Sequence, residues 1–347
     1  MSRNDSLLPL GWRTHFQVQV DETEDFEAAR IAAVHRNRVD AVGTEGTQSL
    51  DLGGRSREMG LTVGDWVLLD SSAGDIVRRL DPFGVFQRRA AGTTGDIQRI
   101  AANVDTLFVV TSANRDFNVA RLERYLAVAH DAGAYPIIVI TKADTVDTVD
   151  EFLKVARSVS PGIVVEALDA RDAEQVSVLR DWCSSGQTVA LVGSSGVGKS
   201  TLINTLTGAD QQTSATREDD QRGRHTTTQR SMHALPDGGW LIDTPGMREL
   251  QLVDVGDSLN DVFADIANLA ERCRFQDCEH NAEPGCKVQE AIDNGRLDVD
   301  RLRRYRKLQA ENRRNSESMA ERRSRDKHLG KLYKVVQSET RHRKEGK

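Results

Sequence analysis

The sequence predicts an α/β protein of three parts, in which a central parallel sheet lies between a β-rich N-terminal unit and a helical C-terminal region. From residue 100 to 250, apolar runs alternate with amphipathic stretches of about ten residues, the pattern of parallel strands joined by crossover helices. From 31 to 90, short alternating runs are separated by glycine-containing turns, which is typical of a small all-β barrel, with an OB-fold as the best fit. Beyond residue 250, three of the four cysteines lie close together ahead of a strongly charged stretch.

The elements of the central domain can be placed one by one from these patterns. We expect strands at 104–110, 136–140, 163–165, 188–192 and 240–242, and helices at 120–132, 150–158, 173–182 and 201–206. The expected domains are an N-terminal extension at 1–30, an OB-like barrel at 31–95, the α/β domain at 96–250, a cysteine-containing module at 251–300 and a basic helical tail at 301–347.

The composition is that of a folded protein of two or three domains. The 347 residues are 38% hydrophobic and 29% charged, which is enough apolar content for globular cores. No apolar run approaches the ~18–20 residues that cross a bilayer, and the N-terminus lacks the apolar stretch of a signal peptide. With only four cysteines, these observations predict a cytoplasmic protein without a membrane partner, and nothing indicates an obligate dimer, so we expect a monomer.

Charge is distributed unevenly along the chain. The net charge is −6, yet residues 301–347 hold 17 Lys and Arg against 6 Asp and Glu. A basic tail on an acidic body favours a polyanionic partner, and a solvated charged helix is the alternative. The barrel offers a similar choice between phosphate contacts and simple packing against its neighbour. Its candidate phosphate contacts are Arg55, Arg57, Arg78, Arg79, Arg88 and Arg89.

The strongest motif follows the strand expected at 188–192. It fits the P-loop pattern G-x-x-x-x-G-K-[ST], and it stands between a strand and a helix as that motif requires. Backbone N–H groups of such a loop converge on phosphate oxygens, the lysine neutralises phosphate charge, and the hydroxyl of the last residue binds Mg²⁺. The nucleotide-binding candidates here are Gly193, Ser194, Ser195, Gly196, Val197, Gly198, Lys199, Ser200 and Thr201, with Lys199 also counted as catalytic.

A second motif, Thr141, Lys142, Ala143 and Asp144, directly follows the strand expected at 136–140. Ligands bind at this carboxyl edge of parallel sheets. A carboxylate there can accept hydrogen bonds from both N1–H and the 2-amino group of guanine, whereas adenine offers no such pair of donors. Beside a P-loop, Asp144 therefore predicts a guanine nucleotide.

A third motif completes the expected nucleotide site. Asp243 follows the strand at 240–242, where it would hold Mg²⁺ through water, and the N–H of Gly246 would meet the γ-phosphate. The run from Gly223 to Thr228 lies in a polar stretch suited to a switch loop, from which Thr227 is our candidate Mg²⁺ ligand, with Ser200 and Asp243. Which threonine of 226–228 binds the ion stays open.

These motifs occur in a permuted order, because Asp144 precedes Lys199 and Lys199 precedes Asp243. Ordinary GTPases place the guanine-recognition motif last, so the sequence predicts a circularly permuted P-loop GTPase domain; a parallel sheet tolerates permutation when the old termini lie close together. An ATP-using P-loop kinase would leave Asp144 and this order unexplained.

With the Gly223-Arg-His-Thr-Thr-Thr run, the barrel and the Cys/His module, the chain resembles the RsgA (YjeQ) family of ribosome-assembly GTPases over residues 31 to 300. The resemblance implies GTP hydrolysis stimulated by the small (30S) ribosomal subunit during its late maturation, with the barrel and zinc module contacting 16S rRNA. The usual Ser-Ala loop that contacts guanine is replaced by Glu166 and Ala167, to which we assign no role.

The residue that activates water is less evident. Met247 stands where many GTPases place a glutamine that orients the attacking water. His225 is the nearest catalytic candidate, because an imidazole can position or deprotonate water near neutral pH, and the resemblance implies the same role. Capping or packing of the switch loop is the alternative for His225.

The cysteine cluster has the spacing C-x₄-C-x-H-x₅-C, formed by Cys273, Cys278, His280 and Cys286. Three thiolates and one imidazole complete a tetrahedral zinc shell without water, so we expect one structural Zn²⁺ per chain. Cys183 lies far away and is interpreted as a packing residue.

The function that these observations favour is a GTPase that acts on the small ribosomal subunit and releases from it on hydrolysis, with GTP, Mg²⁺ and Zn²⁺ as ligands. The alternative is a GTP-binding RNA chaperone or translation regulator with little turnover.

Overall fold

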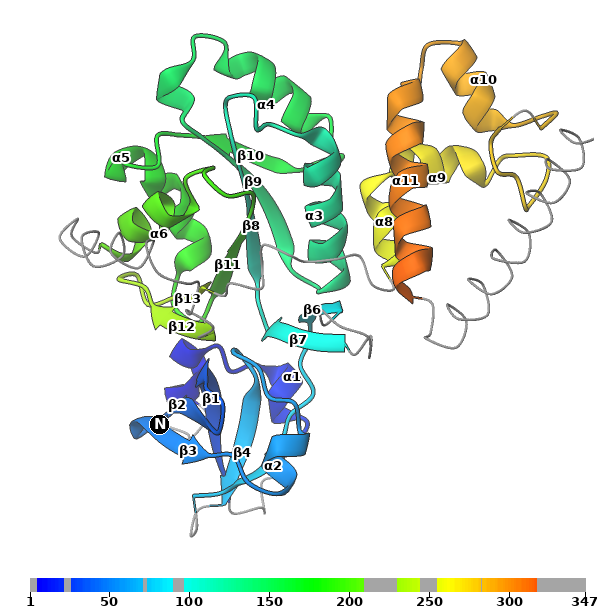
Figure 1. The fold of residues 1–347 in the computed structure, drawn as a ribbon. Helices are drawn as coiled ribbons and strands as arrows, with labels where there is room; N and C mark the ends of the chain where they lie inside the picture. Colours follow the sequence, from blue (N-terminus) through cyan, green and yellow to red (C-terminus); the bar gives the residue numbers. More distant parts are fainter. Residues whose placement is uncertain are drawn as a thin grey trace, which may run out of the picture.

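The computed structural model describes residues 5–21, 26–70, 74–89, 97–208, 230–243, 255–281 and 283–316. Figure 1 shows three bodies: a β-rich N-terminal unit, a central α/β domain above it, and a group of C-terminal helices beside the central domain. Among the described residues, no helix combines the length and the apolar character needed to cross a membrane.

The central domain is built on a mainly parallel sheet with the strand order β10-β9-β8-β11-β13-β12, in which only β12 runs antiparallel to its neighbour β13. Its strands are β8 (Thr106–Ser112), β9 (Tyr135–Thr141), β10 (Val164–Ala167), β11 (Thr188–Val192), β12 (Arg230–Ala234) and β13 (Trp240–Asp243). Its helices are α3 (Val119–Asp131), α4 (Val149–Arg157), α5 (Ala173–Val176) and α6 (Lys199–Thr207), with the 3-10 turns η2 (Ala143–Thr145) and η3 (Ser177–Cys183).

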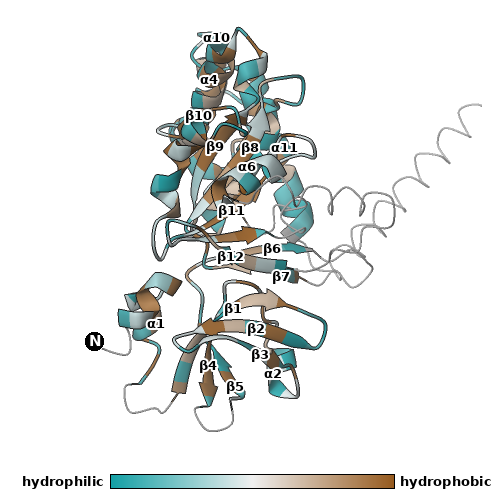
Figure 2. Cartoon of the chain, turned by 90° about the vertical axis from the view of Figure 1, so that its left-hand side faces the viewer, coloured by the Kyte–Doolittle hydropathy of each residue, from teal (hydrophilic) through white to brown (hydrophobic). Residues whose placement is uncertain are grey.

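Both faces of this sheet are covered, which explains why its strands are continuous apolar runs. On β8, Leu107 and Val109 belong to the core cluster that includes α3, whereas Phe108 and Val110 belong to the opposite cluster that includes α6. The hydrophobic colouring of β8 and β9 in Figure 2 reflects this burial on two sides. Cys183 lies in the second cluster, 1% exposed, and burial raises the pKa of its thiol to about 12. The prediction that it is a packing residue is therefore confirmed.

The N-terminal unit is joined to the central sheet by backbone hydrogen bonds, because β1 pairs with β12, with β2 and with β4. Its strands are β1 (Phe26–Val34), β2 (Arg38–Gly43), β3 (Gly46–Asp51), β4 (Trp66–Asp70), β5 (Ile76–Arg79), β6 (Val85–Arg89) and β7 (Ile97–Ala102), of which β6 and β7 form a separate two-stranded sheet. Its helical pieces are η1 (Asp5–Leu10), α1 (Thr14–Gln17) and α2 (Arg55–Glu58).

The segment before β1 is part of the folded unit. Trp12 and Phe16 are buried and pack with Trp66 of β4. Arg13 forms an ion pair with Asp105, whose carboxylate also accepts from the N–H of Thr188 on β11 (2.8 Å). The sequence predicts an extension up to residue 30 and a barrel from 31; in the structure the first strand begins at Phe26, and its buried Arg30 donates to the carbonyl oxygen of Leu10 (2.7 Å).

The C-terminal helices are α8 (Gly256–Val262), α9 (Ala264–Ala270), α10 (Lys287–Asp293) and α11 (Val299–Ser316). One face of α11 is apolar, and its Leu302, Tyr305 and Leu308 are buried in the same cluster as α3 and α8. The junction with the central domain also contains charge, because Glu123 of α3 is fully buried and accepts hydrogen bonds from two arginines of α11. The C-terminal helices are therefore packed against α3 rather than attached by a linker alone (Figure 1).

Candidate nucleotide and metal sites

The predicted P-loop connects β11 to α6 at the carboxyl edge of the sheet. Gly193 has φ +148°, and a Cβ there would lie 2.2 Å from the carbonyl oxygen of Val110, so the position requires glycine. Gly198, with φ +93°, precedes the first residue of α6, Lys199. The loop thus begins and ends at glycines whose backbone other residues rarely adopt.

Lys199 is folded back onto this loop. Its side chain is mostly buried, and its Nζ donates to the carbonyl oxygens of Gly193 (2.7 Å) and Ser194. Ser200 and Thr201, the next two residues of α6, are exposed. The ammonium group therefore lies within the turn at the N-terminus of α6, where helix geometry leaves N–H groups free to meet an anion.

The motif from Thr141 to Asp144 contacts the P-loop directly. Thr141 ends β9 and is fully buried; its hydroxyl lies 2.5 Å from the carbonyl oxygen of Val197 and 3.0 Å from that of Thr111, and can donate to either. Lys142, in the left-handed region with φ +58°, donates from Nζ to the carbonyl oxygen of Gly196 (2.8 Å). The structure therefore brings together the two motifs that the sequence separates by about fifty residues.

Ala143 and Asp144 lie in η2, immediately after that contact. The Asp144 side chain is 34% exposed, and its Oδ2 accepts a hydrogen bond from Nη2 of Arg171 (2.8 Å). Arg171 also binds Asp169 through Nε (2.9 Å to Oδ1), and this bond lowers the pKa of the Asp169 carboxyl. The guanine-recognition candidate is thus an accessible carboxylate with a cationic partner.

Asp243 is the last residue of β13, which runs parallel to β11. Because the two strands are in register from Thr188 with Trp240 to Ala190 with Ile242, the carboxyl end of β13 lies beside the start of the P-loop, and Asp243 is exposed there. The other candidates of this part of the site, Thr227, His225 and Gly246, lie outside the described residues, as do Met247 and the rest of the 223–228 run.

Two arginines at this edge were not anticipated from the sequence. Arg121, in the first turn of α3, donates to the hydroxyl of Ser194 in the P-loop. Arg171 follows β10 and reaches Asp144 as described above. Each arginine comes after a strand, β8 or β10, whose carboxyl end lies at the edge of the sheet where the site forms. That position along the chain was the signal in the sequence that could have identified these two residues, because neither belongs to a recognisable motif.

The four predicted metal ligands converge on one point. Among the described residues, Cys273, Cys278, His280 and Cys286 form a group whose ligand atoms all lie within 4.8 Å of one another, and this cluster could hold a metal ion. Three of the separations are 3.9 Å between the sulfurs of Cys273 and Cys286, and 3.6 and 3.5 Å from these sulfurs to Nδ1 of His280. Burial lowers the pKa of His280, which favours the neutral imidazole that a metal requires.

Backbone groups support this cluster. The N–H of Lys287 donates to Sγ of Cys273 and the N–H of Gln289 to Sγ of Cys286, each at 3.4 Å, and Gln289 also holds the carbonyl oxygen of His280 through its side chain. Cys286 is the N-cap of α10, so the helix begins at a ligand. Contacts of this kind orient ligands and favour the charged thiolate.

The basic residues of α11 divide into two groups. Arg301 and Arg304 point inward, where both bind Glu123 and Arg301 also binds Asp265 (2.6 Å). The basic tail in which the sequence predicts contact with a polyanion includes Arg304, but the guanidinium of this residue is paired with the fully buried carboxylate of Glu123. The exposed basic residues of this helix are Arg303, Lys307, Arg313 and Arg314.

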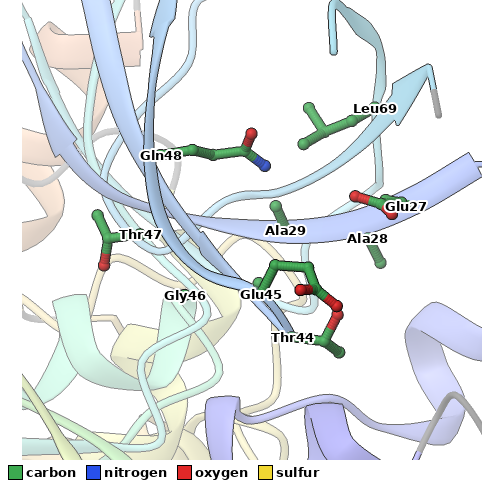
Figure 3. A pocket seen from close by; sticks show the side chains of 10 residues that line it. Glu27, Ala28, Ala29, Thr44, Glu45, Gly46, Thr47, Gln48 and Leu69 are labelled. Atoms are coloured by element: carbon green, nitrogen blue, oxygen red, sulfur yellow. The ribbon is translucent and has the colours of Figure 1, made fainter. Parts of the chain in front are cut away.

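A small recess lies in the N-terminal unit, away from these sites (Figure 3). It is formed between β1, the turn from β2 to β3, and β4. None of the predicted nucleotide or metal ligands lines it. Its lining residues are Glu27, Ala28, Ala29, Gly43, Thr44, Glu45, Gly46, Thr47, Gln48 and Leu69.

Comparison with known proteins gives consistent matches. The model of the RsgA GTPase family matches residues 84–253. The chain is 48% identical over 348 residues to the small ribosomal subunit biogenesis GTPase RsgA 2 of Vibrio parahaemolyticus, covering 99% of this chain and 96% of that protein. It is 49% identical over 316 residues to the small ribosomal subunit biogenesis GTPase RsgA of Mesorhizobium japonicum, covering 90% of this chain and 91% of that one.

Solved structures show the same fold. YjeQ from Thermotoga maritima superimposes with a TM-score of 0.62 at 23% identity, over 82% of this chain and 97% of its own. YloQ, described as a circularly permuted GTPase, gives a TM-score of 0.58 at 21% identity, over 86% of this chain and all of its own (100%). The predicted fold class, a permuted GTPase domain with a β-rich N-terminal unit and a Cys₃His module, is confirmed.

Proposed function

The chain belongs to the RsgA GTPase family and hydrolyses GTP, and we propose that it does so on the small ribosomal subunit during late maturation, bound to the subunit's 16S rRNA. Hydrolysis is stimulated by the subunit and coupled to release from it, and the protein works as a monomer in the cytoplasm. The observation that carries the proposal is the contact of the Thr141–Asp144 motif with the P-loop, in a chain whose relatives are named for biogenesis of that subunit.

The nucleotide binds across these two motifs. The backbone from Gly193 to Thr201 surrounds the phosphates, and Lys199 exchanges its two carbonyl acceptors for phosphate oxygens. Asp144 accepts from N1–H and the 2-amino group of guanine, while the aliphatic part of Lys142, held by Gly196, lies along the base. Base selection and phosphate binding are thus connected by hydrogen bonds within the protein.

Magnesium is held by Ser200, Thr227 and Asp243 together with the nucleotide. Ser200 is the second residue of α6 and Asp243 ends β13, and both residues are exposed at the carboxyl edge of the sheet. Hydroxyl and carboxylate oxygens are the ligands that Mg²⁺ prefers, and the ion supplies charge stabilisation for the phosphoryl group being transferred.

His225 acts on the attacking water in this proposal. Because Met247 cannot orient water as a glutamine would, a second group has to do so, and an imidazole is suited to that task near neutral pH. His225→Ala should reduce subunit-stimulated turnover by roughly 10²-fold or more, in the range of a lost general base, while the Kd for GTP changes little. An equal loss of affinity and turnover would contradict this role.

The ion in the Cys₃His cluster is zinc. A tetrahedral ion with Zn–S bonds of about 2.3 Å and Zn–N bonds of about 2.0 Å requires ligand separations of about 3.8 Å between sulfurs and about 3.5 Å from sulfur to nitrogen. The separations of 3.9, 3.6 and 3.5 Å fit these values. With four protein ligands the ion stabilises the fold of the module and leaves no open position for chemistry.

RNA contact falls to the exposed basic residues rather than to the whole basic run. On α11 these are Arg303, Lys307, Arg313 and Arg314, and the remaining basic residues of 317–347 lie outside the described residues. Each phosphate that they neutralise adds roughly 0.7–0.9 to the slope of log affinity against log salt. Replacing these residues of α11 with Gln should flatten this slope, and an unchanged slope would indicate a solvated charged helix.

The test of the proposed function is multiple-turnover GTP hydrolysis with and without purified 30S subunits. Strong stimulation by 30S, absent with 50S subunits as the control, is the expected result. Tight GTP binding without stimulated turnover would instead favour a GTP-binding RNA chaperone or translation regulator.

A further inference from the structure

The contact between Arg171 and Asp144 is a part of the nucleotide site that no sequence motif explains. Arg171 reaches Oδ2 of Asp144 from the loop after β10, at 2.8 Å between nitrogen and oxygen. Asp144 is the residue to which the proposed function assigns guanine recognition. A cation bound to that carboxylate must influence how it meets the base.

Arg171 is itself fixed in place. Its Nε lies 2.9 Å from Oδ1 and its Nη2 2.8 Å from Oδ2 of Asp169, a two-point contact of the geometry that arginine and carboxylate prefer. The backbone N–H of Arg171 also donates to Oδ1 of Asp169 (2.9 Å). The guanidinium therefore reaches Asp144 as part of a preassembled Asp169–Arg171–Asp144 chain.

The loop that carries this chain is attached to both halves of the site. The N–H of Leu168 donates to the carbonyl oxygen of Ile140 on β9 (2.9 Å), just ahead of the Thr141–Asp144 motif. On the other side, the hydroxyl of Thr205 on α6 donates to the carbonyl oxygen of Ala170 (2.7 Å). Arg171 thus extends from backbone that is held between the guanine-recognition motif and the P-loop helix.

We propose that Arg171 is a positioning residue for guanine recognition, which orients the Asp144 carboxylate toward the base. The inference rests on the proposed role of Asp144. An ionised carboxylate has about four lone-pair sites on its two oxygens. The guanidinium uses one site on Oδ2, which leaves Oδ1 and the second site on Oδ2 for the two donors of guanine. Arg171 and the base can therefore bind Asp144 at the same time.

The effect should be moderate and specific for the base. The Arg171 side chain is 65% exposed, so solvent screens the pair, and removing such a pair changes affinity by roughly twofold to fivefold. Without Arg171 the Asp144 carboxylate can rotate, and this should weaken the binding of guanine more than that of hypoxanthine. Guanine needs both carboxylate oxygens oriented, whereas hypoxanthine lacks the 2-amino group. The ratio of GDP to IDP affinity should therefore fall in Arg171→Ala.

The experiment is displacement of a fluorescent GDP analogue by GDP, IDP and ADP from the full chain. Wild type, Arg171→Ala, Arg171→Lys and Asp169→Asn are compared. Arg180→Ala is the matched control, because Arg180 forms a similar exposed pair with Asp237 (3.1 Å) away from the site. In Arg171→Ala we expect weaker GDP binding and a smaller ratio of GDP to IDP affinity. Arg171→Lys should recover part of the GDP affinity, and Asp169→Asn should lose less of it than Arg171→Ala. The control should keep the wild-type affinities.

A double-mutant cycle separates action through Asp144 from a direct contact with the base. In an Asp144→Asn background, measured with XDP, Arg171→Ala should change affinity less than it does for GDP in the wild-type background. An equal effect in both backgrounds, tighter GDP binding in Arg171→Ala, or equal losses for GDP and IDP would each overturn the inference. If wild type itself does not prefer GDP to ADP, the proposed function fails instead.

Discussion

The buried carboxylate of Glu123 allows a quantitative test of how the C-terminal helices are held on the GTPase domain. Its side chain is 0% exposed and accepts from Nε of Arg304 at 2.8 and 3.0 Å and from Nη1 of Arg301 at 3.2 Å. Replacing Glu123 with Ala keeps a strong helix former at this place in α3, so the loss arises from the ion pairs rather than from helix propensity.

The expected magnitude follows from what each arginine retains. Arg301 keeps Asp265 (2.6 Å) and the carbonyl oxygens of Val159 and Val262 (3.1 and 3.0 Å). Within the described part of the chain, the hydrogen bonds of Arg304 go to Glu123. Removing one partner of a buried pair costs ~3–5 kcal/mol. Because Arg301 remains paired and Arg304 is 24% exposed, we expect a loss of about 3 kcal/mol in the free energy of unfolding.

The assay is urea unfolding of wild type, Glu123→Ala and Glu311→Ala, followed by circular dichroism. Glu311→Ala is the matched control, because it removes a pair between the same two helices, Arg124 with Glu311, whose side chains are 35% and 18% exposed. That pair should contribute about 1 kcal/mol or less. If the two variants unfold within about 0.5 kcal/mol of each other, the buried network does not hold these helices in place.

Three further predictions concern the phosphate loop, the metal cluster and pH. Thr141→Val removes, at nearly constant side-chain volume, the hydroxyl that lies against the carbonyl oxygen of Val197. The loss of a hydrogen bond of about 1 kcal/mol should weaken GDP binding about fivefold, which isothermal titration calorimetry would measure. Unchanged GDP affinity would refute a link between this hydrogen bond and nucleotide binding. Cys286→Ser, or removal of the metal by a chelator, should speed amide hydrogen exchange in α10, while the affinity for GDP should stay the same. Unchanged hydrogen exchange would contradict a metal ion that stabilises this module. Burial lowers the pKa of His130 from 6.5, so its contribution to stability is complete above pH 6.5 and is lost as pH falls below that value. The midpoint of urea unfolding should therefore decrease less between pH 7 and pH 5 in His130→Gln than in wild type. An equal decrease in both proteins would show that other titratable groups cause it.

The arrangement of the sheet and its motifs could be predicted because local signals agree with the fold. The strand expected at 188–192 and the helix expected at 120–132 are found as β11 and α3, since strands covered on both faces are continuously apolar and crossover helices have one apolar stripe. The three P-loop glycines have positive φ, which is why that pattern is specific. The cysteine spacing likewise predicted a cluster that the structure brings together.

Contacts between distant segments could not be predicted in this way. Nothing local to Arg304 distinguishes it from Arg303, yet one is paired with the buried Glu123 and the other is exposed, because the phase of α11 against α3 decides their environments. The pairing of β1 with β12, which makes the N-terminal unit continuous with the GTPase sheet, depends on edge strands whose partners no sequence pattern encodes. The role of Arg171 could not be predicted for the same reason, because its partner Asp144 is 27 residues away in sequence.

The most direct test of a single guanine-nucleotide site is the affinity of wild type and Asp144→Asn for GDP and XDP, measured by equilibrium binding. Exchange of the carboxylate for an amide replaces an acceptor with a donor where the 2-substituent of the base lies, so the preferred ligand should change from GDP to XDP while binding of the phosphates persists. If Asp144→Asn kept the wild-type preference for GDP, the base would be recognised elsewhere. The proposal that the P-loop and the Thr141–Asp144 motif form one nucleotide site would then be wrong.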